Sequence, residues 1–167
     1  MLVLGVDPGT AITGYGLVRH APDGDRLEAA AYGVITTPSD WAMPQRLQKI
    51  YQDLTILIRE HHPTEAAVEQ LFFSRNVKTA LAVGQARGVV LLSLADRGLS
   101  VHEYTPLQVK QSVVGYGRAE KAQVQELVRL LLGLEAVPQP DDAADALAIA
   151  ICHLHSARMT FLMQSAS

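Results

Sequence analysis

Short apolar stretches separated by turn residues dominate the first part of the chain, and they predict β-strands. We predict three strands joined by short turns, over residues 2–6, 14–20 and 27–37. The period then changes, because apolar residues recur every three or four positions from Met43 to Ile58, with Pro44 near the start. This spacing predicts an amphipathic helix.

In the rest of the chain, strand-like and helix-like patterns alternate. We predict a strand at 66–69, a long helix at 76–97, a strand at 100–104, a helix that begins with Thr105-Pro106-Leu107-Gln108, a helix at 119–132 and a final helix at 141–157. The four residues from Thr105 form a capping box with proline at the first helical position. Strands joined by turns, followed by strands joined through helices, predict an α/β fold with a mixed sheet flanked by helices.

Length and composition fit this interpretation. The 167 residues are 49% hydrophobic and 19% charged, so we expect one domain over residues 1–160 and a flexible tail at 161–167. We find no uninterrupted apolar run of about 18 residues, and therefore expect no membrane span. The single cysteine, Cys152, fits a reducing cytoplasm, and we expect it to be a small core residue.

Charge is distributed unevenly along the chain. The net charge of −3 argues against a nucleic-acid partner, yet residues 72–132 carry eight basic and four acidic side chains. A basic middle within an acidic protein is typical of a surface for a polyanion. Scattered solvated charges would give the same count.

Four carboxylates occupy positions of special interest. Asp7 and Glu69 each follow an apolar run at the end of a predicted strand, and Asp142 and Asp145 lie three residues apart where the final helix begins. Acids at a helix N-terminus can simply cap it, and Asp-Pro-Gly is turn chemistry. Glu69 has neither duty, and burial of an unpaired carboxylate costs several kcal/mol.

These four acids need a positive partner if they meet in the fold. Two like charges about 4 Å apart repel by about 4 kcal/mol at an effective dielectric constant of about 20. Oxygen ligands alone favour a hard cation such as Mg²⁺ or Mn²⁺. Two such ions about 3.5–4 Å apart bind both sides of a phosphodiester during hydrolysis. The acids therefore predict a two-metal nuclease site.

An ordered set of motifs resembles the RuvC family of bacterial Holliday junction resolvases over residues 2–155. In chain order the motifs are Gly5-Val6-Asp7-Pro8-Gly9, Thr13-Gly14-Tyr15-Gly16, Val68-Glu69-Gln70-Leu71-Phe72, Val83-Gly84-Gln85-Ala86-Arg87-Gly88, Gln108-Val109-Lys110-Gln111, Gly115-Tyr116-Gly117, Ala119-Glu120-Lys121 and Asp142-Ala143-Ala144-Asp145-Ala146-Leu147-Ala148. No single motif decides the matter, but the ordered set is highly specific.

The resemblance implies a ribonuclease H-like fold, with a five-stranded sheet and helices on both faces, and a homodimer that cuts four-way DNA junctions in recombination and repair. It implies two Mg²⁺ ions per site, replaceable by Mn²⁺, and branch-migration motor proteins of the Ruv system as partners. The family's acidic ligands correspond to Asp7, Glu69, Asp142 and Asp145. The additional Asp141 shifts the acid pattern by one residue, and the spacing to Asp145 favours Asp142.

The middle of the chain supplies the candidate DNA contacts, which are Phe72, Phe73, Arg75, Lys110, Arg118 and Lys121. The two aromatic rings follow Glu69 in a predicted loop, where they can stack on splayed bases or pack beneath the loop as core. The resemblance favours stacking for Phe72. The last three basic residues surround a glycine-rich turn, where they can bind phosphate or remain solvated.

Gly84 and Gly88 lie four residues apart inside the long predicted helix, where each costs about 1 kcal/mol relative to alanine. They predict a close approach, either by the helix of a partner subunit or by this chain's own sheet. A two-fold dimer would supply the two matched cuts that a junction requires. Four histidines have no evident ligand partner and are interpreted as structural or surface residues: His61, His62, His153 and His155.

Three other interpretations share parts of the pattern. Asp7-Pro8-Gly9-Thr10 also resembles the first phosphate loop of actin-like ATPases and sugar kinases, which need two such domains. A ribonuclease H that cuts RNA–DNA hybrids would use the same metals. A non-catalytic DNA-binding relative is expected to lose at least one of the four acids, and all four are present.

Overall fold

The described residues form five strands and five helices, which follow one another in the predicted order. A computed structural model describes residues 1–22, 24, 26–70 and 77–165. Its strands are β1 (Leu2–Asp7), β2 (Ile12–His20), β3 (Leu27–Thr36), β4 (Glu65–Glu69) and β5 (Ser100–Tyr104). Its helices are α1 (Met43–His61), α2 (Val77–Asp96), α3 (Pro106–Val114), α4 (Lys121–Leu131) and α5 (Asp141–Ser165).

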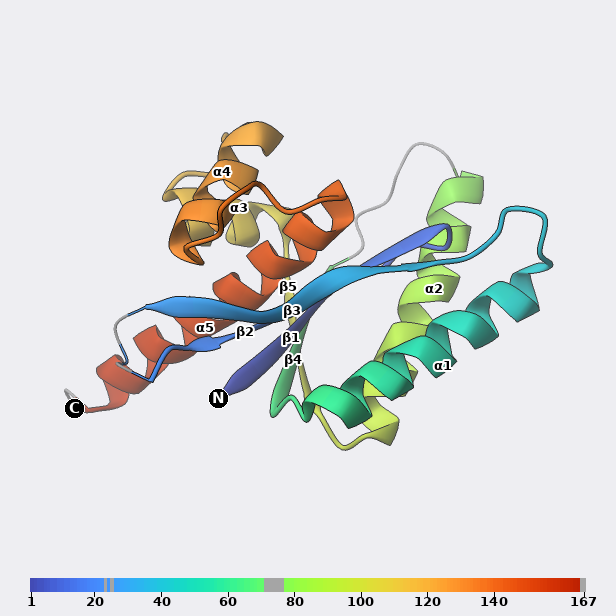
Figure 1. Ribbon diagram of the computed structural model, residues 1–167, viewed down its shortest axis with the longest axis horizontal. Coiled ribbons are helices and arrows are strands. Elements are labelled where there is room, and N and C mark those ends of the chain that lie inside the picture. Colours follow the sequence, from blue (N-terminus) through green and yellow to red (C-terminus); the bar gives the residue numbers. More distant parts are fainter. Residues whose placement is uncertain (23, 25, 71–76, 166–167) are drawn as a thin grey trace.

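The strands form one mixed sheet in the order β3-β2-β1-β4-β5. β1 pairs antiparallel with β2, and β2 with β3, whereas β1, β4 and β5 run parallel to one another. Helices α1 and α2 cover one face, and α3, α4 and α5 lie on the other (Figure 1). The predicted mixed five-stranded sheet with helices on both faces is confirmed.

Side-chain alternation divides the interior into two cores. On β1, Leu4 and Val6 pack into the core beneath α1 and α2, whereas Val3 packs into the core beneath α5. β4 alternates in the same way, as period-two geometry requires. Continued to the last residue of each strand, the alternation puts Asp7 and Glu69 on the α5 side of the sheet.

Glycines on β1 and β2 let α5 lie directly on the sheet. A Cβ atom added at Gly5 would lie 2.1 Å from the carbonyl oxygen of Ala146, and one added at Gly14 would lie 2.0 Å from that of Asp142. Gly16 makes a similar close approach to the same helix. No side chain fits between helix and strands at these points, so the glycines fix the depth at which α5 packs.

Several local predictions are confirmed. Thr105 and Gln108 form the predicted capping box, because the Thr105 hydroxyl accepts from the Gln108 backbone N–H at 3.1 Å and the Gln108 side chain accepts from the Thr105 N–H at 2.8 Å. Gly115 ends α3 in the left-handed conformation. Cys152 is buried and unpaired, as expected.

The last helix is longer than predicted. α5 ends at Ser165 instead of near Ala157, and it includes residues 161–165 of the predicted tail. No glycine or proline follows Pro140 in the sequence, so nothing in the chain stops a helix at the predicted point.

Helix α2 combines a packed side with an exposed apolar side. Within the described part of the chain, it is the one helix that is long and apolar enough to cross a membrane, by length and composition only. The sequence analysis did not single out this helix, because Lys78 and Arg87 interrupt its apolar run. One side of α2 nevertheless packs against the sheet through Ala86, Val90 and Leu94.

We predict that Gly5→Ala lowers the free energy of unfolding by about 3 kcal/mol or more, because the added methyl group meets backbone atoms of α5 that cannot move separately. Gly33→Ala is the matched control on β3, since its methyl group meets only the end of the Tyr15 side chain, which can turn aside. Urea denaturation measures both. Equal losses in the two variants would contradict the proposed depth of α5.

Candidate active site

Two of the predicted acids end neighbouring parallel strands. Val6 on β1 pairs with Val68 on β4, and the next residues are Asp7 and Glu69. Both carboxylates therefore project from the same edge of the sheet and toward the same face. Sheet register alone brings together residues that are 62 positions apart in the sequence.

Helix α5 brings the other two acids to this edge. Gly14 pairs with Asp7 in the sheet, and the backbone of Asp142 lies directly over Gly14. Asp145 follows almost one turn later on the helix, on the same side as Asp142. The charges of Glu69, Asp145 and Asp142 all act on Asp7, in this order of strength. The structure thus brings the four predicted acids into one electrostatic group.

Burial and mutual repulsion disfavour the ionised form of these acids. Burial, followed by the charges of Glu69, Asp145 and Asp142, raises the pKa of Asp7 from 3.8 to about 7. Burial is also the largest cause that raises the pKa of Glu69, with the charge of Asp145 adding to it. The pKa of Asp145 is raised in the same way, although Lys121 opposes the shift. Such a group of acids is ready to exchange protons for a cation.

Lys121 is the first residue of α4. Among the described residues, it is the cation that forms ion pairs with the acids of α5. Its ammonium nitrogen lies 3.0 Å from an Asp145 oxygen and 3.2 Å from an Asp141 oxygen. Burial lowers the pKa of Lys121, but the hydrogen bonds and charges of the two acids outweigh burial and raise it overall. Lys121 therefore stays protonated and offsets part of the negative charge.

Asp141 and Asp142 have different environments. The Asp141 side chain is exposed, and the neighbouring Gln125 and Lys121 side chains lower its pKa. Asp142 is half-buried over Gly14, and its charge acts on Asp7. The geometry therefore favours Asp142 over Asp141 as the member of the acid group that lies near Asp7.

A cavity of about 230 Å³ opens beside the acids. Residues of β4, α3, α4 and α5 line it, among them Glu69, Lys110, Lys121 and Asp145. Lys110 lowers the pKa of Glu69, and therefore favours the ionised carboxylate that burial disfavours. Two of the predicted DNA-binding lysines thus lie at the acids rather than on a remote surface.

The acid oxygens are not drawn together as tightly as one shared ion requires. Among the residues that the structure describes, the three possible ligand atoms that all lie within 4.8 Å of one another belong to Glu65, His102 and His153 instead.

Hydrogen bonds hold the turn between β1 and β2 in place. The Thr13 hydroxyl donates to the Gly9 carbonyl at 2.7 Å, and the Thr10 hydroxyl donates to the Ala82 carbonyl of α2 at 2.8 Å. These bonds fix the turn that follows Asp7. The side chain of Thr13 is fully buried, although the bond that it makes is only partly buried.

Sequence analysis missed the role of Arg87. Its guanidinium donates to the Glu69 carbonyl at 3.3 Å and lies 2.8 Å from a Glu103 oxygen. Arg87 thereby holds the end of β4 from helix α2. The sequence offered one signal, namely a charged residue beside Ala86 in the apolar middle of a helix.

The remaining predicted site residues are the two aromatic residues, two of the arginines and the two glycines of α2. Phe72, Phe73 and Arg75 lie outside the described residues. Arg118 is exposed in the turn between α3 and α4. No described atom lies within 4 Å of a Cβ atom added at Gly88, so the chain's own sheet does not make the predicted close approach there. Gly84, one turn earlier, is half-buried.

Comparison with known proteins gives a consistent result. The sequence profile described as crossover junction endodeoxyribonuclease RuvC matches residues 3–153. A protein of that name from Heliobacterium modesticaldum is 62% identical over 156 residues, which cover 93% of this chain and 95% of the relative.

Two solved structures from Thermus thermophilus match closely in fold. RuvC alone superposes with a TM-score of 0.88 at 37% identity and covers 96% of this chain and 97% of its own. RuvC in complex with a Holliday junction substrate gives 0.86 at 34% identity and covers 95% and 96%.

The raised pKa of Asp7 predicts how stability depends on pH without divalent metal. Between about pH 4 and 7 the folded protein keeps a proton on Asp7 that the unfolded chain has released, so stability falls as pH rises through this range. In Asp7→Asn this titrating group is absent, and its Tm should fall by several degrees less between about pH 5 and 8. Thermal unfolding in EDTA measures the difference.

Asp40→Asn is the control for this comparison, because it removes an exposed carboxyl from the segment between β3 and α1. Its pH profile should follow that of the unchanged protein. Parallel profiles for the unchanged protein and Asp7→Asn would show that Asp7 does not titrate as the structure indicates.

Proposed function

Because the chain belongs to the RuvC family of crossover junction endodeoxyribonucleases, we propose that it resolves four-way DNA junctions by paired, symmetric hydrolysis of phosphodiester bonds. The observation that carries this proposal is the group of four carboxylates at one sheet edge, beside a cavity lined by Lys110 and Lys121. The Thermus relative, solved in complex with a Holliday junction substrate, supports the choice of DNA over other phosphodiesters.

The acids fit a hard divalent cation. The family uses divalent metal, and we propose that Asp7, Glu69, Asp142 and Asp145 would hold two Mg²⁺ ions, for which Mn²⁺ can substitute. The donor set contains only carboxylate oxygens, and the raised pKa values of three of its members are the sign of uncompensated negative charge. When bound, the ions supply charge stabilisation for the attacking and leaving oxygens of the phosphodiester.

The chain's own residues position and charge the site. Arg87 fixes the backbone at Glu69, and the Thr13 hydroxyl fixes the turn after Asp7. Lys121 orients Asp145 through its 3.0 Å contact. Lys110 and Lys121 give the cavity a positive wall, which suits a DNA phosphate that approaches the acids.

We predict that Asp142→Asn reduces cutting of a four-way junction by at least about 100-fold in Mg²⁺, because it removes a carboxylate oxygen from the metal ligands. Asp7→Asn, Glu69→Gln and Asp145→Asn should do the same. Junction binding should change by only a few-fold, since positive residues rather than the acids attract the DNA. Gel assays of cleavage and of mobility shift measure the two effects on the same samples.

Asp141→Asn is the matched control, because its side chain is exposed and faces Lys121 instead of Asp7. It should retain cutting within about three-fold. If Asp141→Asn abolished cutting and Asp142→Asn did not, the assignment of the metal ligand would be wrong. Faster cutting of an RNA–DNA hybrid than of the junction would instead favour ribonuclease H activity.

We further propose that the enzyme acts as a homodimer through the α2 outer face, which we define as Val77, Leu81, Gly88 and Leu92. These positions recur along one side of α2, and their three apolar side chains are between 54% and 78% exposed. No described atom fills the space at Gly88. An apolar helix face with a glycine at its middle suits the same face of a second copy related by two-fold symmetry.

This dimer predicts a specific effect of charge on α2. Leu92→Glu should convert the dimer to a monomer at micromolar concentration, because two carboxylates would be buried against each other across the two-fold axis. Ile56→Glu is the control, since Ile56 is similarly exposed but lies on α1. Light scattering with size-exclusion chromatography measures the mass. A dimer that survives Leu92→Glu and dissociates with Ile56→Glu would place the interface on α1.

Phe72 completes the proposed junction contacts on sequence grounds alone. It lies three residues after Glu69, and its ring can insert where junction bases are already easily unstacked, whereas ordinary duplex DNA resists such insertion. Phe73, Arg75 and Arg118 would add contacts beside it. Such an enzyme would act on cytoplasmic DNA, alongside the branch-migration motor proteins of the Ruv system.

A further inference from the structure

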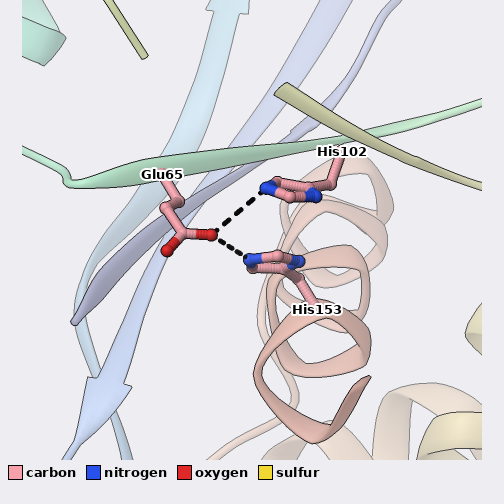
Figure 2. Close-up of side chains that lie close together, drawn as sticks. All are labelled: Glu65, His102 and His153. Carbon is pink, nitrogen blue, oxygen red and sulfur yellow. Dashed lines mark hydrogen bonds and ion pairs between the residues drawn. The ribbon is translucent and has the colours of Figure 1, made fainter. Parts of the chain in front are cut away.

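A second cluster of metal-ligating side chains lies on the same face of the sheet as the acids, but at the other end of β4. Glu65 is the first residue of that strand and Glu69 the last, which separates them by about 13 Å along the strand. Glu65 meets His102 of β5 and His153 of α5 (Figure 2). The mechanism proposed above uses none of these three residues.

The two imidazole rings converge on one carboxylate oxygen. Nε2 of His153 lies 2.7 Å from Oε2 of Glu65, and Nε2 of His102 lies 3.2 Å from the same atom. One possible ligand atom from each of the three residues lies within 4.8 Å of the other two. The centroids of the two rings lie 4.3 Å apart, and both Nε2 atoms point toward the Glu65 carboxylate (Figure 2).

A neighbouring hydroxyl orients the buried histidine. Nδ1 of His153 lies 2.7 Å from the Tyr104 hydroxyl, which leaves Nε2 directed at Glu65. Histidines that bind metals usually hydrogen-bond through the other ring nitrogen in this way. Burial, the largest cause, also lowers the pKa of His153, and the neutral ring is the form that binds a metal.

The cluster is anchored on one side and open on the other. The His153 side chain is 4% exposed, whereas those of Glu65 and His102 are 30% and 43% exposed. An ion can therefore enter from solvent past His102 without disturbing the core. The open side also leaves room for water to complete the coordination.

We propose that Glu65, His102 and His153 form a binding site for a divalent transition-metal ion of the Zn²⁺ and Co²⁺ class, separate from the acids that bind Mg²⁺. Two imidazole nitrogens and one carboxylate oxygen are a donor set of this class and a poor one for Mg²⁺. At metal–ligand distances of about 2.1 Å, tetrahedral ligand atoms lie about 3.4 Å apart, so the carboxylate has to move by less than about 1 Å. The ion would join β4, β5 and α5.

Metal titration of the intact protein, without DNA, tests this site. We expect Co²⁺ to give the visible absorption of a tetrahedral site at one ion per chain. We expect Zn²⁺ at about 100 times its Kd to raise the Tm by about 5–10 °C. Asp7→Asn/Glu69→Gln, which disables the proposed Mg²⁺ site, should keep both responses. A loss of nuclease activity in that variant tests the proposed function and leaves this site untouched.

Substitution of the exposed ligand provides the decisive comparison. His102→Gln should lose the Co²⁺ absorption and weaken Zn²⁺ binding at least about ten-fold, while keeping its fold, because His102 is the least buried of the three. Glu65→Gln should behave in the same way. His61→Gln, at the end of α1, controls for adventitious binding to surface histidines. Equal responses in His102→Gln and the unchanged protein, or no response in either, would overturn the proposal.

Discussion

The contact of α5 with the glycines of β1 and β2 is the constraint on which the rest of the structure depends. Gly5, Gly14 and Gly16 leave no side chain between the strands and the helix, and the helix backbone occupies that space. The helix is buried continuously from Ala146 to Leu154, because α3 and α4 cover its other side. A methyl group at Gly5 or Gly14 would therefore displace the helix that carries two of the four acids.

The same contact explains why the acids are electrostatically strained. The depth of α5 puts Asp142 over Gly14 and its charge within reach of Asp7, while the strand register puts Glu69 on the other side. Burial then opposes ionisation of a carboxyl that repulsion already disfavours, and the pKa of Asp7 rises to about 7. Packing alone would favour an apolar side chain here, so the presence of acids at this position points to a chemical role.

Local patterns predicted most of the fold because they determine most of it. Strand alternation and helical spacing identify the elements, and the capping box at Thr105 marks a helix start to the residue. Glu69 was recognisable because a charge that ends a buried strand has no local explanation. Asp7 stood out with it as a second charge at the end of an apolar strand. The end of α5 was not predictable, since no breaker marks it.

Long-range contacts account for what sequence analysis did not find. Arg87 reaches Glu69 across 18 residues, and His153 reaches Glu65 across 88, so no short motif links either pair. The histidines were interpreted as structural or surface residues without ligand partners. His153 is indeed buried, but Glu65 and His102 lie close enough to share a metal ion with it, which the sequence did not indicate. The choice between Asp141 and Asp142 likewise depended on which of them lies over Gly14.

Helix α2 connects the proposed dimer to the proposed site of cutting. Its first turns line a cavity of about 510 Å³ together with Asp142 and the turn after Asp7, and its Thr10 contact secures that turn. A two-fold axis through the α2 outer face would therefore fix the two acid sites at a set separation and orientation. Two nicks at symmetric positions require that relation between subunits, and a loosely tethered pair of monomers would not provide it.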